Sequence, residues 1–67
     1  MFEVVHDEWS DTYSIEAGND VLDKDGNIRI NYDFRPNIHH WRTCWEAQSF
    51  LDAWRESDFI PQIINED

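Results

Sequence analysis

Residues 43–56 read TCWEAQSFLDAWRE, and their apolar side chains recur at the spacing of an α-helix. Thr43 and Glu46 have the spacing of a capping box, in which the Thr hydroxyl accepts a hydrogen bond from the backbone N–H three residues later. At about 100° per residue, the apolar side chains fall in one arc about 120° wide. These core-facing residues are Cys44, Ala47, Phe50, Leu51 and Trp54. The pattern predicts one amphipathic helix that begins after Thr43 and ends near Ser57.

Before this helix the apolar side chains alternate with polar ones, which is typical of strands with one buried face. The clearest alternation covers residues 28–34, residues 12–17 alternate in the same way, and residues 2–5 form a shorter strand. The Asp-Gly pair in residues 23–27 is typical of a tight turn, and residues 21–22 would close a hairpin on its other side. The pattern predicts a three-stranded antiparallel sheet, arranged as a meander.

Pro61 cannot continue a helix, so the residues after Ser57 are expected to form a short extended tail. Its apolar side chains should pack back onto the core: Phe59, Ile60, Ile63 and Ile64. We therefore expect residues 1–67 to form a single α+β domain in the order β-β-β-α plus the tail, with the helix on one face of the sheet. A domain this small buries only about 60% of the surface that its unfolded chain exposes, so a deep substrate cavity is not expected.

The chain is strongly acidic. Fifteen Asp and Glu residues face five Lys and Arg residues, for a net charge of −10. Such a field opposes compaction and repels nucleic acid and anionic lipid surfaces. We therefore expect neither direct nucleic-acid binding nor membrane binding. We expect instead a protein partner with a basic surface, such as a nucleic-acid-processing enzyme or complex, because complementary charge speeds encounter and rejects wrong partners.

Trp45 is predicted to project from the polar side of the helix, in line with Ser49, Asp52 and Glu56. Tryptophan is enriched among the residues that dominate binding energy at interfaces, and the two carboxylates suit a basic partner that has an apolar pocket. We predict that these four residues bind a partner. The alternative is that Trp45 covers the loop before the helix or the C-terminal tail.

A second predicted partner-binding group joins the first two strands, where Asp7, Glu8 and Asp11 flank Trp9. A cationic partner would relieve the repulsion among these carboxylates. Carboxylates at alternate strand positions stand about 6.8 Å apart, close to the spacing of successive phosphates in one nucleic-acid strand, so the group is compatible with nucleic-acid mimicry. The alternative is an ordinary solvated face.

We expect no cofactor and no metal ion. Residues 23–28 resemble the middle of a calcium-binding EF-hand loop. However, if Gly26 takes the sixth loop position, the first and twelfth positions become Val21 and Tyr32, so two essential carboxylate ligands are missing. A hairpin turn explains the same residues.

His39, His40 and Cys44, with His6 far away in the sequence, are the residues from which a zinc site or a thiolate pair would be built. A structural zinc site needs ligand pairs at both ends of a spacing motif, and here there is one cluster and one distant histidine. We therefore predict that the protein is not an enzyme. The lone cysteine and the absence of a secretory signal predict a cytoplasmic location.

These observations predict a small acidic binding protein that occupies and blocks a basic, nucleic-acid-binding surface of its partner. In size, charge and aromatic content the chain resembles small acidic phage-encoded inhibitors of host nucleases, polymerases or defence complexes. That resemblance implies the cytoplasm of a phage host as its location. The alternative function is a structural adaptor that self-associates, as a homodimer for example, through Trp45 or Trp9.

Overall fold

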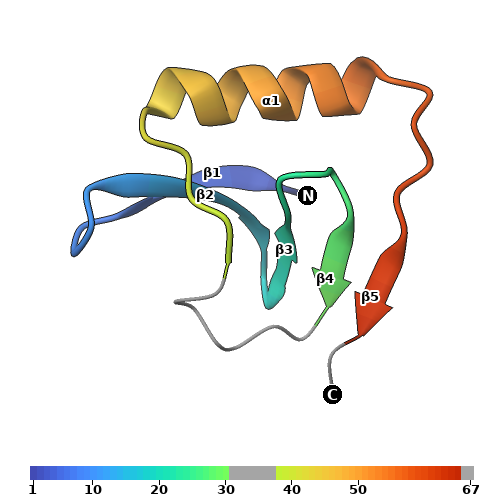
Figure 1. The fold of residues 1–67 in the computed structure, drawn as a ribbon, viewed down its shortest axis with the longest axis horizontal. Helices are drawn as coiled ribbons and strands as arrows, with labels where there is room; N and C mark the ends of the chain where they lie inside the picture. Colours follow the sequence, from blue (N-terminus) through green and yellow to red (C-terminus); the bar gives the residue numbers. More distant parts are fainter. Residues whose placement is uncertain (31–37, 66–67) are drawn as a thin grey trace.

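The computed structural model describes residues 1–30 and 38–65, which form one sheet with a helix across one face (Figure 1). The elements are β1 (Glu3–Asp7), β2 (Thr12–Ala17), β3 (Asp20–Leu22), β4 (Ile28–Ile30), α1 (Cys44–Glu56) and β5 (Ile63–Asn65). In the described part of the chain the sheet has five strands in the order β1-β2-β3-β4-β5. The predicted α+β class is confirmed. The prediction of three antiparallel strands is wrong in detail, because the sheet is larger and mixed.

The additional strand β3 follows a two-residue turn at Gly18 and Asn19, since Ala17 pairs with Asp20 across it. Gly18 has a φ of +62°, a conformation that glycine adopts without steric cost. A five-residue turn then leads from β3 to β4. In it the Asp23 carboxylate accepts hydrogen bonds from the backbone N–H groups of Asp25 and Asn27, both at 2.9 Å. The hairpin-turn interpretation of this segment is therefore confirmed.

The C-terminal tail is a strand of the sheet. β5 pairs in parallel with β4, so that Ile63 lies opposite Ile28. The backbone N–H of Ile28 donates to the Gln62 carbonyl at 2.9 Å, and the Gln62 N–H donates to the Asn27 side-chain oxygen at 3.0 Å. The tail is thus extended, as predicted, and its backbone is what holds it in place.

The prediction that the tail's apolar side chains pack onto the core is wrong for most of them. Ile60 is 87% exposed and Ile63 is 61% exposed, and Phe59 is exposed as well. The reason is geometric: α1 packs on β1 and β2, whereas β5 lies at the other edge of the sheet, beyond the helix (Figure 1).

The main core lies between α1 and the sheet. Its buried members are Ile15, Leu22, Trp41, Ala47 and Leu51, and Phe2, Val4, Tyr13, Ile28, Phe50 and Trp54 pack against them. The helical arc predicted from the sequence is confirmed at all its positions except Cys44, which is exposed. Cys44 lies at the margin of the arc, in the first turn of the helix, where the predicted packing is weakest.

Trp41 is a core residue that the sequence pattern did not reveal. It lies before the helix and pairs with Tyr13 through two backbone hydrogen bonds of 2.8 and 2.7 Å. The short strand β3 pairs with the end of β2, at Glu16 and Ala17, and the Trp41 bridge pairs with β2 nearer its start, at Tyr13. The bridge therefore fixes where the chain enters α1.

The predicted strand over residues 28–34 begins correctly at Ile28, and β4 is described as far as Ile30. Its predicted continuation through Tyr32 and Phe34 lies outside the described residues. β1 ends at Asp7, two residues beyond the predicted end of the first strand.

The helix begins and ends where the sequence predicts, with Thr43 as its N-cap and Ser57 as its C-cap. The Thr43 hydroxyl accepts from the Glu46 N–H at 3.0 Å. The described residues contain one helix, α1. With 13 residues and a mixed surface, it is too short and too polar to cross a membrane.

We expect Thr43→Ala to lower the free energy of unfolding by about 1 kcal/mol, because it leaves the Glu46 N–H without its side-chain acceptor. Urea denaturation followed by circular dichroism measures this loss. Thr43→Ser is the matched control, since it retains the hydroxyl and should stay close to the parent protein. An unchanged midpoint for Thr43→Ala would mean that this cap contributes nothing to the stability of the helix.

Candidate protein-binding surfaces

The first surface is the outer ridge of α1. Trp45 is 76% exposed, and Asp52 and Glu56 are exposed on the same side of the helix. Ser49, between them, is half-buried. At about 1.5 Å per residue, the two carboxylates lie roughly 10 and 16 Å along the axis from Trp45. The predicted outward orientation of Trp45 is confirmed, and the alternative in which it covers neighbouring segments is wrong.

The second surface is the tip of the β1–β2 hairpin, where Trp9 is 99% exposed. The Asp7 carboxylate accepts from the Trp9 backbone N–H at 3.0 Å. Asp11 has a φ of +53°, and its carboxylate lies 2.9 Å from Nε2 of His6. Asp7 and Asp11 therefore have partners within the turn, and these contacts order the turn around Trp9. They offset part of the repulsion expected among the carboxylates.

A chain of hydroxyl groups connects this tip to the segment that precedes α1. The Ser10 and Thr12 hydroxyl oxygens are 2.5 Å apart, and the Thr12 hydroxyl lies 3.0 Å from Nδ1 of His40. Because His40 is adjacent to the Trp41 bridge, the hairpin tip is tied to the body of the domain. Trp9 is thus displayed on an ordered turn.

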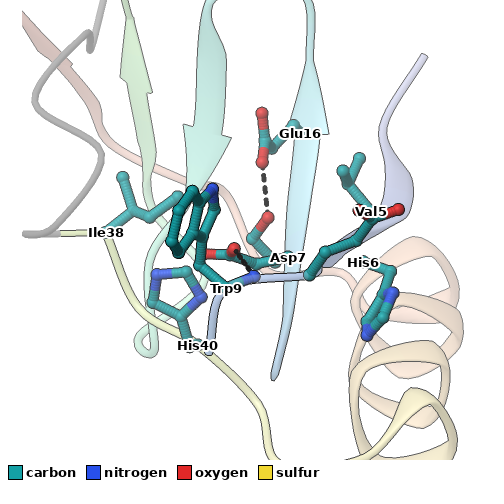
Figure 2. Close-up of a pocket in the computed structure, with 9 residues that line it drawn as sticks. Val5, His6, Asp7, Trp9, Glu16, Ile38 and His40 are labelled. Atoms are coloured by element: carbon teal, nitrogen blue, oxygen red, sulfur yellow. Dashed lines mark hydrogen bonds between the residues drawn. The ribbon is translucent and has the colours of Figure 1, made fainter. Parts of the chain in front are cut away.

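The sheet face opposite α1 carries a pocket of about 390 Å³ (Figure 2). Pairing of Val5 with Ser14, and of Asp7 with Thr12, places these side chains on that face. Figure 2 shows Trp9, Ile38 and His40 along one side of the pocket and Val5 on the other. The pocket therefore combines β1 and β2 with the hairpin tip and the segment before α1.

Two polar residues of this face are buried, which the sequence pattern did not predict. Ser14 is 3% exposed and Glu16 is 7% exposed, and the Ser14 hydroxyl donates to Oε2 of Glu16. In the sequence, Ser14 and Glu16 alternate with Tyr13 and Ile15. This alternation indicates a second, polar face of the strand, but it does not predict that the polar face is buried. Val21 of β3, which pairs with Glu16, belongs to a small second apolar cluster in which it packs with Ile38.

The predicted site residues thus fall into two groups on opposite sides of the sheet. Asp7, Glu8 and Trp9 line the pocket, whereas Asp11 is not among the lining residues and contacts His6, which is one of them. The helix group lies on the outer side of α1: Trp45, Ser49, Asp52 and Glu56. In Figure 1 the hairpin tip and the first turn of α1 lie at the same end of the molecule.

Within residues 1–30 and 38–65, no three His, Cys, Asp or Glu side chains are grouped so as to hold a metal ion. The His39 ring meets Trp41 edge-on at 4.5 Å, and His40 contacts Thr12. The Asp23 carboxylate, the first acid of the calcium-like segment, holds the turn and lies 3.3 Å from Nε of Arg29. These side chains therefore have structural contacts that account for their positions.

His39 provides a test of pH dependence. Burial is the main cause that lowers the pKa of His39 below its ordinary value of 6.5. His40 and Lys24 lower it further, while Asp23 and Asp25 partly oppose them. Because the unfolded chain then binds this proton more tightly than the folded protein, the His39 contribution to stability is present above pH 6.5 and is lost as the pH falls below 6.5 and through the lowered pKa of the folded protein.

We therefore expect the unfolding free energy to fall between about pH 7.5 and 5.5, and to fall less in His39→Asn, which cannot take up the proton. Chemical denaturation at both pH values measures the difference. His6→Asn is a matched control that should retain the parent slope due to His39. Equal slopes for the parent and His39→Asn would contradict the assignment.

Comparison of the chain with protein-family models, with curated proteins and with solved structures finds no match.

Proposed function

We propose that the protein is a small non-enzymatic binding protein that occupies and blocks a basic, nucleic-acid-binding surface of a partner protein. The observation that carries this proposal is the pair of exposed indoles, Trp45 at 76% and Trp9 at 99%, each with carboxylates beside it on a chain of net charge −10. Exposed tryptophans contribute most to binding when a partner pocket desolvates them. The surrounding carboxylates select a partner of opposite charge.

Five Lys and Arg residues cannot offset fifteen Asp and Glu residues, and two of the arginines make internal contacts. Arg29 contacts Asp23, and Arg55 donates from its guanidinium to the Phe2 carbonyl at 2.6 Å. Both arginines therefore serve internal contacts. A surface with this charge repels nucleic acid and attracts the basic grooves that bind it, which supports competition with nucleic acid for a shared partner. An inhibitor of phage type, acting as a nucleic-acid mimic in the host cytoplasm, fits this mode of action.

Affinity capture with the immobilised protein, followed by elution with rising salt, tests the proposal. The expected partner elutes at raised salt, and the free protein then inhibits its binding to nucleic acid. Two results would contradict the proposal: a partner whose capture is insensitive to salt, or one that binds nucleic acid equally well with and without the protein. Capture on the Trp45→Ala protein is the matched control and should be much weaker.

Self-association as an adaptor is the second candidate function, and the place of β5 at the end of the described sheet favours it. β5 is the last strand in the sheet order, and the exposed Ile60 and Ile63 lie on it or just before it. Edge strands that carry exposed apolar side chains promote pairing with another chain. Sedimentation separates the candidates: a concentration-dependent dimer that Ile63→Lys abolishes favours the adaptor, and a monomer favours the binding protein.

A further inference from the structure

The last strand, β5, has a single neighbour in the described part of the chain. It packs against β4 and against no other described helix or strand. Ile60, shortly before β5, is 87% exposed, and Ile63, its first residue, is 61% exposed. Figure 1 shows β5 beyond α1, at the end of the sheet opposite β1. Placing β5 on the sheet therefore buries little apolar surface, which is the main source of stability in folding.

Backbone contacts centred on Gln62 hold the start of β5. The Gln62 N–H donates to Oδ1 of Asn27 at 3.0 Å, and the Gln62 carbonyl accepts from the Ile28 N–H at 2.9 Å. Two successive residues thus hold both backbone groups of one residue, and Ile63–Asn65 then pairs in parallel with Ile28–Ile30. Because each of these hydrogen bonds replaces one with water, its net contribution to stability is small.

The chain between α1 and β5 has an anchor of its own. The Ser57 hydroxyl accepts from the Phe59 N–H at 2.9 Å, where the chain leaves the helix. The Phe59 ring lies against the β3–β4 turn, since a Cβ atom placed on Gly26 would be 3.4 Å from Cε2 of Phe59. The segment that follows, residues 60–65, can therefore move while the end of α1 keeps its contacts.

The rest of the domain is held by buried contacts that β5 does not share. Among the described residues, the main core between α1 and the sheet has no member in β5. The β3–β4 turn is closed by the Asp23 N–H, which donates to the Asn27 carbonyl at 3.0 Å, and by the indole of Trp54 on the Gly26 carbonyl. Proteins open locally in cooperative units, and those with few buried contacts open most readily. The difference in burial predicts that β5 opens first.

We propose that residues 60–65 form a releasable strap on the edge of β4, which opens as a unit while α1 and β1–β4 remain folded. The closed strap pairs with the β4 backbone, and the open strap bares the Ile28 N–H and the Asn27 side chain. A bared strand edge can pair with another extended chain, so the strap controls access to this edge. The inference goes beyond the proposed function and does not depend on a basic partner.

Amide hydrogen exchange of the full chain, followed by NMR at several low urea concentrations, tests the strap. The Ile28 amide reports its release, and the amide of Leu51, in the buried middle of α1, reports global unfolding. After correction for intrinsic rates, we expect Ile28 to exchange at least about a hundredfold faster than Leu51. The Ile28 rate should change little with urea, because release exposes little surface, whereas the Leu51 rate should rise. Equal rates with the same urea dependence would overturn the proposal.

Thr43→Ala separates local from global opening, because it weakens the cap of α1 and does not touch the strap. We expect it to speed the exchange of Leu51 about fivefold and to leave that of Ile28 within about twofold, since α1 stays folded when the strap opens. An equal increase at both amides would mean that Ile28 exchanges only by global unfolding, and would refute the strap.

Asn27→Ala tests the contact that closes the strap, because it removes the acceptor of the Gln62 N–H and keeps the backbone of the turn. The exchange of Ile28 should become severalfold faster. Asn19→Ala is the matched control: it removes the same side chain from the exposed β2–β3 turn and should leave the Ile28 rate unchanged. Equal effects of the two substitutions would contradict the assignment. So would exchange of the Asp23 and Ile28 amides at one rate, because the whole β3–β4 hairpin would then be opening.

Discussion

Trp54→Ala is expected to lower the free energy of unfolding by about 3–5 kcal/mol, a large share of what a small domain possesses. Trp54 joins three parts of the fold. Its indole N–H donates to the Gly26 carbonyl at 2.8 Å, and its ring meets Phe2 edge-on with 5.6 Å between centroids. Removing it therefore opens the core and leaves a carbonyl of the β3–β4 turn without its donor.

The close approach at Gly26 explains why this contact is specific. Gly26 has a φ of +84°, and a Cβ atom placed there would lie 3.1 Å from Cδ1 of Trp54. The turn and the indole are thus fitted to each other. Chemical denaturation followed by circular dichroism measures the loss, and Trp45→Ala is the control, expected to stay within about 0.5 kcal/mol of the parent because its side chain is exposed. Equal destabilisation by both substitutions would contradict this division of roles.

Trp45→Ala is expected to weaken binding of the captured partner by at least about 2 kcal/mol, or roughly thirtyfold in Kd. The fold does not need a tryptophan at position 45, because this side chain lies on the solvent side of α1, opposite the buried Ala47 and Leu51. An exposed indole beside Asp52 is well placed to enter an apolar pocket on a basic partner.

Isothermal titration calorimetry of the partner with both proteins measures this effect. Ala53→Gln is the matched control, because Ala53 is also exposed on α1 and glutamine is a comparable helix former. It should leave the affinity nearly unchanged. Similar affinities for the parent protein and Trp45→Ala would remove the helix ridge from the interface.

The helix could be predicted from the sequence because its signals are local. The Thr43 cap spans three residues, and the helix phase that it sets places Trp45 outward without reference to the rest of the fold. β5 could not be predicted in this way. Its pairing depends on contacts such as that between Gln62 and Asn27, which are 35 residues apart and follow no local pattern.

Part of the candidate site could be predicted from the sequence, and part could not. Trp9 and its acidic neighbours stand out in the sequence, and the structure exposes Trp9 as a solvated tip. The pocket beside it was not predictable, because alternation marks Ser14 and Glu16 only as a polar face. The pocket forms where segments that are far apart in the chain meet, and local patterns do not reveal contacts such as the packing of Val21 with Ile38.

The central claim is that the acidic surface of this protein blocks a basic surface of its partner. The most direct test is to measure the rate constant for association with the captured partner at several salt concentrations. Exposed charges act over a Debye length of about 8 Å at physiological ionic strength, so steering by a net charge of −10 should weaken strongly as salt rises. We expect the rate constant to fall on the order of tenfold or more between about 0.05 and 0.5 M salt in stopped-flow measurements. A rate constant that stays flat across this range would contradict recognition through the acidic surface.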